Sequence, residues 1–170
     1  MIATSLVARQ HRLAADDKAA AGETARAAAA KKEQLTKAAR QYERVEEAYR
    51  GSTAAAPTRA ADARYLKLAA LRRADCAYEL GAYGDAVKCY DAVAKRWADD
   101  PVALAASVQV VNAYVAQGKL PEAKSANEQA RLLLSKLPQD ALARDGGFVM
   151  PRAYWEQWLK WTGVAAASTW

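Results

Sequence analysis

The sequence predicts an all-α protein built from helix–turn–helix pairs, and three observations support this class. Residues 81–86 and 118–123 share one layout 37 residues apart, with a glycine and an alanine in the same places. Internal repetition is typical of architectures in which one structural unit recurs. Glycine (8) and proline (5) are few among the 170 residues. No stretch shows the alternation of apolar and polar residues that is typical of strands.

The N-terminal part, residues 4–50, is predicted to be helical almost throughout because Ala, Arg, Lys, Glu and Gln dominate it. One long helix and two helices joined at Gly22 both fit. Large apolar side chains are sparse before Leu35, so we expect this segment to need a surface to pack against. The apolar residues 1–8 are too few to span a membrane and lack the charged lead of a signal peptide. They fit an ordinary helix start or the stub of a membrane-anchored protein.

The first helix pair is predicted from the residues that start and end its helices. Small residues and a proline at 51–58 indicate a loop, with Thr58 as the N-cap of a helix over residues 59–80. Gly81 ends that helix as a C-terminal cap, and the partner helix covers residues 85–97.

The second pair has a clear start, because Asp100 offers an N-cap carboxylate before a proline at the first helical position. Its helices cover residues 101–117 and 121–137 on either side of Gly118. Pro138 ends the pair.

A short aromatic helix is predicted over residues 150–161. Helical spacing puts Tyr154, Trp158 and Trp161 on one face, with Trp155 beside them. We expect this helix to cover the end of the hydrophobic core. An exposed Trp155 would instead indicate a docking site for a partner or for a second copy of the chain.

The two pairs resemble the tetratricopeptide repeat, in which small residues let two helices cross closely and an aromatic residue lies further along the second helix. In the first pair the small residues are Ala74 and Ala86, and the aromatic residue is Tyr90. In the second pair Ala123 is the small residue and Tyr114 is an aromatic residue of the first helix. The resemblance implies a right-handed stack of such pairs, which needs capping elements at its ends.

A partial third copy precedes these pairs. Ala38, Tyr42 and Val45 match residues 86, 90 and 93 at a displacement of 48 residues. The resemblance therefore implies an earlier pair with residues 24–32 as its first helix; the missing glycine near Glu33 leaves one continuous helix as the alternative. The implied organisation is an alanine-rich helical segment over residues 1–33, repeats over 34–138 and a capping element with a tail over 139–170.

The resemblance also implies a concave face, lined by the first helix of each pair, on which a partner would bind. The residues of this face expected to contact a partner are Leu71, Arg72, Asp75, Tyr78, Glu79, Gln109, Asn112 and Val115. The face combines apolar residues, one asparagine and two acids, and it lacks the paired cations that would clamp a carboxylate. Alternatively, these residues pack against a neighbouring helix.

Catalytic chemistry finds little support in the sequence. His11 is the only histidine, so no catalytic triad with a histidine base can be assembled elsewhere. Cys76 and Cys89 stand in neither a CxxC nor a zinc spacing. A disulfide and two buried free thiols both fit their places on one helix pair. We therefore predict no enzymatic activity, no cofactor and no metal site.

The net charge of +6 does not mark a nucleic-acid-binding face, because the basic residues are dispersed. Residues 1–50, 51–100 and 101–170 carry net charges of +3, +1 and +2. Recognition of nucleic acids needs basic residues gathered on one surface.

These patterns favour a non-catalytic interaction or scaffolding module that holds a peptide or helix of a protein partner. The alternative is a homo-oligomer assembled through the N-terminal helix and the aromatic C-terminus, and nucleic-acid binding through dispersed charge is a third reading. In outline the chain is similar to bacterial proteins that place such repeats after a membrane or coiled-coil segment. The cytoplasm and the soluble part of an envelope-anchored protein both fit as its location.

Overall fold

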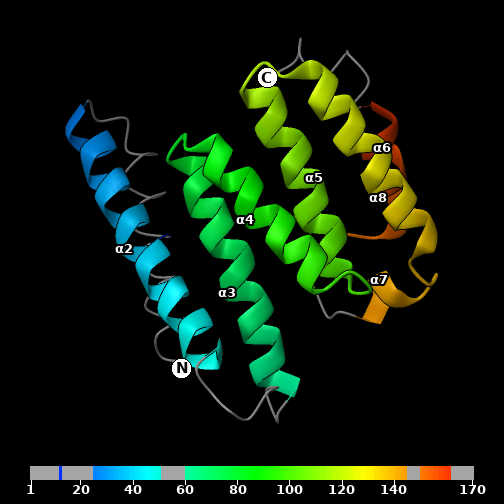
Figure 1. The fold of residues 1–170 in the computed structure, drawn as a ribbon, viewed down its shortest axis with the longest axis horizontal. Coiled ribbons are helices and arrows are strands. Elements are labelled where there is room, and N and C mark those ends of the chain that lie inside the picture. Colours follow the sequence, from blue (N-terminus) through cyan, green and yellow to red (C-terminus); the bar gives the residue numbers. More distant parts are fainter. Residues whose placement is uncertain (1–11, 13–24, 51–59, 145–149, 162–170) are drawn as a thin grey trace. The chain divides into compact units, whose positions relative to one another are not determined.

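The predicted all-α class is confirmed by a computed structural model, which describes residues 12, 25–50, 60–144 and 150–161 and contains no strand within them. The helices, labelled in Figure 1, are α2 (Ala25–Arg50), α3 (Ala60–Glu79), α4 (Tyr83–Arg96), α5 (Pro101–Ala116), α6 (Leu120–Lys136), α7 (Ala141–Arg144) and α8 (Arg152–Trp161). The chain divides into two compact units, Met1–Asp85 and Ala86–Trp170. None of the helices within the described ranges is both long enough and apolar enough to cross a membrane.

The core of the first unit lies between α2 and α3, which run side by side (Figure 1). On α2 the buried residues Leu35, Ala38, Tyr42 and Val45 follow one another at intervals of three or four. This spacing gathers them on one face of the helix. They pack with two buried residues of α3, Ala69 and Cys76.

Helix α2 is continuous, so the prediction of a separate helix over residues 24–32 is wrong and the single-helix alternative holds for the described part. No glycine or proline interrupts residues 25–50. An ion pair between Glu33 and Lys37, four residues apart, spans the place where a turn was expected. Residues with high helix propensity on both sides give the chain no reason to break there.

The match between α2 and α4 extends to burial. Ala38, Tyr42 and Val45 are 0, 2 and 2% exposed, and their counterparts 48 residues later are 0, 1 and 3% exposed. Those counterparts, Ala86, Tyr90 and Val93, thus occupy the same kind of position in the second unit. The sequence displacement therefore corresponds to a repeated pattern of buried positions.

Both predicted glycine caps form. Gly81 and Gly118 have φ values of 76° and 72°, a backbone conformation that side chains with a Cβ disfavour. The amides of Gly81 and Ala82 donate to the carbonyls of Tyr78 and Ala77, at 2.9 and 3.0 Å. The Gly118 turn makes the same pair of bonds, which together form a Schellman motif.

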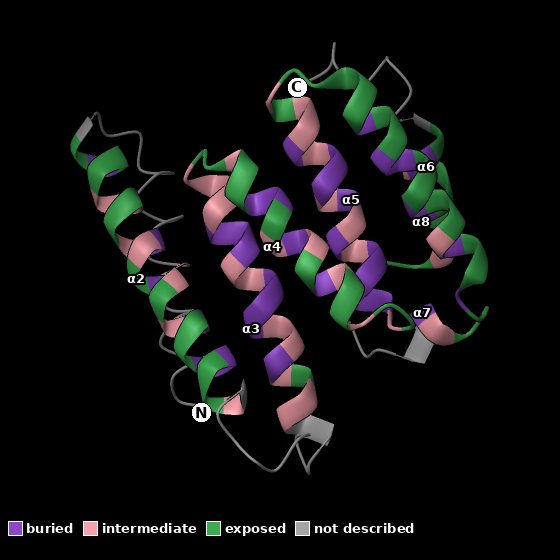
Figure 2. Cartoon of the chain, viewed as in Figure 1, coloured by how far each residue is buried: buried purple, intermediate pink, exposed green. Residues whose placement is uncertain are grey.

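The predicted start of α5 also forms as expected. The carboxylate of Asp100 accepts a 3.0 Å hydrogen bond from the backbone N–H of Val102, and Pro101 occupies the first turn. Helix α5 carries buried residues along most of its length (Figure 2). A helix that is apolar around much of its circumference needs neighbours on several sides. One of these neighbours is α6.

Helix α8 packs against α6 in the second unit. The core here joins Leu104 and Val108 of α5 with Leu134 of α6 and with Trp155 and Leu159 of α8. Within this interface the buried Asn127 side chain donates to the carbonyl of Leu159 at 3.2 Å.

The C-terminal end of α6 is held by Arg152. Its guanidinium donates to the carbonyls of Leu134 at 2.9 Å and of Pro138 at 3.1 Å, and also to that of Leu137. A cation at the last carbonyls of a helix satisfies unpaired acceptors and opposes the helix dipole. The short helix α7, which the sequence did not predict, follows this end of α6.

Candidate functional site

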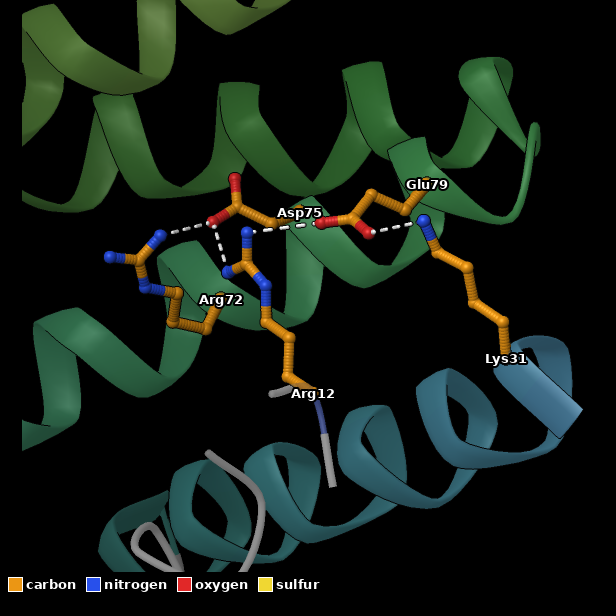
Figure 3. A network of polar contacts seen from close by, with 5 residues as sticks. All are labelled: Arg12, Lys31, Arg72, Asp75 and Glu79. Carbon is orange, nitrogen blue, oxygen red and sulfur yellow. Dashed lines mark hydrogen bonds and ion pairs between the residues drawn. The ribbon is translucent and has the colours of Figure 1, made fainter. Parts of the chain in front are cut away.

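The candidate site lies on α3, where Asp75 and Glu79 stand one helical turn apart and direct their carboxylates towards the same place (Figure 3). Asp75 is one of three buried polar or charged residues in the described chain, at 8% exposed. Burial of a carboxylate costs free energy unless the charge is paired and hydrogen-bonded. The partners of Asp75 and Glu79 therefore define the site.

Arg12 bridges the two carboxylates. Its Nη1 lies 2.9 Å from Oδ2 of Asp75, and its Nη2 lies 3.0 Å from Oε1 of Glu79. Figure 3 shows the guanidinium between the two acids, with its two terminal nitrogens directed to different residues. The planar fork of arginine suits such two-point contact, which the single ammonium of lysine cannot reproduce.

Two further cations of the described residues join the network. Nη1 of Arg72 lies 2.8 Å from the same Asp75 oxygen that Arg12 contacts, and Nζ of Lys31 lies 3.5 Å from Oε2 of Glu79. Lys31 belongs to α2, so the network also links α2 to α3. Arg12, Arg72 and Lys31 thus contribute three positive charges to these two carboxylates.

The electrostatics favour a charged arginine at this position. Burial of Arg12 opposes its charge, but the carboxylates of Asp75 and Glu79 outweigh that effect and raise the pKa of the guanidinium. The Arg12 side chain remains 21% exposed, as does that of Glu79. The contact is therefore partly shielded from water and can still be reached from solvent.

Cys76 and Tyr42 lie in the core of the same unit. Burial raises the pKa of the Cys76 thiol to about 12 and that of the Tyr42 phenol to about 12. At neutral pH both groups are protonated, so Cys76 presents no thiolate nucleophile. No disulfide joins Cys76 to Cys89; Cys76 is buried and Cys89 is half-buried.

A second ion pair fixes α2 on α3 beside the site. Nε of Arg73 lies 2.7 Å from Oε1 of the buried Glu46, and its Nη2 donates to Oε2 at 3.4 Å. The pair thus combines one close charge contact with one long hydrogen bond, and it links α2 to α3 a second time.

The predicted partner-binding residues take different roles. Leu71 is buried, and the ring of Tyr78 meets that of Tyr83 edge to face at a centroid distance of 5.2 Å. Arg72, Asp75 and Glu79 belong to the ion network, so side chains of the same chain contact the acids that the sequence assigned to an open face.

The predicted residues of the second unit lie on α5. The amide of Asn112 donates to Oε1 of Gln109 at 3.0 Å, one turn away, and both residues are half-buried like Val115. The amide that was expected to bond a peptide backbone therefore already has a partner on its own helix.

The aromatic residues of α8 are divided between core and solvent. Trp155 is buried at 8% exposed, Trp158 is half-buried, and Tyr154 is 43% exposed. The Tyr154 ring contacts that of Trp155 edge to face at 5.5 Å. The side chain of Trp161 and the residue His11 lie outside the described parts of the chain. A docking site at Trp155 was expected to show as an exposed side chain, and the Trp155 side chain is instead buried.

Sequence reasoning missed Arg12 and Lys31 as members of the site. Arg12 stands 63 residues from Asp75, and nothing local in the sequence pairs them. The one available signal was the spacing of Asp75 and Glu79, two acids on one helical face that would repel each other unless a cation lay between them. Among the residues with described positions, no three His, Cys, Asp or Glu side chains come together as a metal site.

Comparison of the chain with models of known protein families, with curated proteins and with solved structures finds no match.

Proposed function

We propose that the chain is a non-catalytic protein-interaction module of tetratricopeptide-like helix pairs, and that a partner segment binds along α3. The repeated pattern supports the first part: both glycine turns form the same Schellman motif, and α2 and α4 bury matching residues. Modules of stacked helix pairs bind partners on the face that their first helices line.

The contact of Arg12 with Asp75 and Glu79 is the observation that carries the second part. It identifies a pair of carboxylates on α3 that holds a guanidinium through two separate contacts of 2.9 and 3.0 Å. The same geometry would hold an arginine from another polypeptide. The partner segment is thus expected to be basic and to present an arginine to α3, in place of Arg12.

The partner would compete with the N-terminal part of the chain for these carboxylates. Because Arg12 is already tethered, its effective concentration is high and it weakens the apparent affinity of any competitor. Removal of the Arg12 side chain should therefore strengthen the binding of an arginine-bearing segment.

A synthetic peptide covering residues 1–24 of this chain, carrying a fluorescent label, is the probe. Its binding is measured by fluorescence anisotropy to the full-length wild-type chain and to the full-length Arg12→Ala variant. Several-fold tighter binding to the variant is expected, and Asp75→Asn with Glu79→Gln in that variant should remove the gain. Arg40→Ala, which changes an exposed arginine of α2, is the matched control.

A second peptide with Arg12→Gln distinguishes recognition of arginine from general attraction. It should bind the Arg12→Ala chain no better than the wild-type chain. Equal binding of both peptides to all the chains would contradict the proposed site, provided that circular dichroism shows the variants to be as helical as the wild type.

Self-assembly is the second candidate, and the same contact favours it. An arginine that reaches carboxylates 63 residues away could equally reach those of a second copy. Exchange of this contact between two copies would satisfy the same charges. Sedimentation that shows a monomer at high protein concentration would exclude this alternative.

A further inference from the structure

A small hollow between α6 and α8 belongs to no part of the proposed α3 site. It has a volume of about 190 Å³ and is lined by Arg131, Leu134, Ser135, Arg152, Glu156, Leu159 and Lys160. Sites for drug-sized ligands usually span about 300–1,000 Å³, whereas one liquid water molecule occupies roughly 30 Å³. The hollow is therefore better suited to one or two side chains than to a cofactor.

The lining combines an apolar floor with a positively charged rim. Leu134 and Leu159 are buried members of the α6–α8 core. Around them stand three cationic residues and a single acid, Glu156. An apolar group would bury surface against the leucines, while a carboxylate beside it would meet an excess of positive charge.

The cations of this rim lack strong acidic partners among the described residues. Arg152 donates only to backbone carbonyls, which hold its guanidinium in place without neutralising its charge. The pair of Arg131 with Glu128 spans 3.3 Å between side chains that are 52 and 57% exposed. Such surface pairs contribute little and exchange readily for a better partner. Lys160 is exposed and has no ion pair within the described chain.

We infer that the hollow between α6 and α8 binds a short acidic segment of another protein, with an aliphatic side chain on the leucine floor and flanking carboxylates at Arg131 and Lys160. The inference is independent of the proposed α3 site, which takes the opposite charge. Because the α6 carbonyls already hold the Arg152 side chain in place, less side-chain entropy is lost when a ligand binds beside it.

The test uses the full chain and three labelled peptides with the cores Glu-Leu-Glu, Gln-Leu-Gln and Glu-Ser-Glu, titrated into the millimolar range at low salt. The first peptide should bind most tightly. Lys160→Glu and Arg131→Glu should each weaken its binding by about tenfold or more, because each change removes one charge-assisted contact and adds a repelling negative charge. Lys124→Glu makes the same charge change at an exposed position of α6 outside the lining, and it should alter the affinity by less than about twofold. Arg152 stays unchanged because it caps α6.

Several results would overturn the inference. Absence of binding in the millimolar range would do so, as would equal binding of the glutamate and glutamine peptides. An equal loss of affinity with Lys124→Glu would show that the net charge of the chain, and not the hollow, determines binding. Tighter binding of anionic lipid vesicles than of the Glu-Leu-Glu peptide, with the same sensitivity to Lys160→Glu, would replace the peptide by a membrane surface.

Discussion

The guanidinium of Arg12 lies 2.9 Å from the carboxylate of Asp75, although 63 residues separate them in the sequence. This contact offsets the cost of burying Asp75 and joins Arg12 to α3. It also shows what kind of group the α3 carboxylates accept. The proposed interaction function rests on this relationship, and we expect the contact to stabilise the first unit.

The two glycine turns give a prediction about backbone strain. Gly81→Ala and Gly118→Ala should each lower the free energy of unfolding by about 1–2 kcal/mol, because alanine disfavours the left-handed conformation. Apart from the glycine and its two chain neighbours, no heavy atom lies within 4 Å of a Cβ added at either position, so the expected cost comes from the backbone conformation.

Gly84→Ala is the matched control for these turns. Gly84 also has open space around an added Cβ, but it lacks a positive φ and lies within α4. This variant should be neutral or slightly stabilising. Urea titration followed by far-UV circular dichroism compares the three variants. An equal loss of stability at Gly84 would contradict the strain explanation.

The repeated small positions give a prediction about packing. Ala86 is 0% exposed, so Ala86→Leu should destabilise the chain by about 1–3 kcal/mol through overpacking. Ala92→Leu, at an exposed position of the same helix, should change stability by less than about 0.5 kcal/mol. Thermal unfolding followed by tryptophan fluorescence measures both, because all five tryptophans lie in the second unit. Similar effects of the two variants would count against a close helix crossing at Ala86.

Alkaline pH should destabilise the first unit. The Cys76 thiol has an ordinary pKa of 9.0, and burial raises it to about 12 in the folded chain. Burial likewise raises the pKa of Tyr42 from 10.0 to about 12. Between the unfolded and the folded pKa values, the unfolded chain loses protons that the folded chain retains. The contribution of these two groups to the free energy of unfolding is therefore fully present below pH 9 and is lost as the pH rises towards 12.

The pair of variants Cys76→Ala and Tyr42→Phe isolates this effect. Although each lowers stability at neutral pH, their combination should make the loss of stability above pH 9 shallower than in the wild type. Urea midpoints measured by circular dichroism at a series of pH values report the slope. An unchanged slope in the double variant would assign the alkaline transition to other groups, such as the lysines.

Local chemistry explains why the helix boundaries could be predicted. Gly81 and Gly118 end helices through backbone conformations that few other residues adopt, and Asp100 with Pro101 starts one through a side-chain cap. These effects act within a few residues, so they are visible in the sequence. Residues 25–50 form one helix for the same local reason, because no glycine or proline near Glu33 breaks it.

Long-range pairing explains what could not be predicted. Helical spacing groups Tyr154 with Trp158, but it does not reveal which face of α8 meets α6; in the structure Trp155 and Leu159 are the buried members. The contact of Asp75 with Arg12 joins residues that are 63 positions apart, and no local pattern in the sequence reveals it. The assignment of Asp75, Glu79 and Asn112 to one partner-binding face remains a prediction.

A double-mutant cycle between Arg12 and Asp75 tests the central claim most directly. Full-length wild type, Arg12→Ala, Asp75→Asn and the double variant are unfolded in urea, with circular dichroism as the signal because the first unit contains no tryptophan. For a partly exposed, charge-assisted contact we expect a coupling free energy of about 1–2 kcal/mol. A coupling below about 0.3 kcal/mol would mean that the two residues act independently, which contradicts a guanidinium held by the α3 carboxylates.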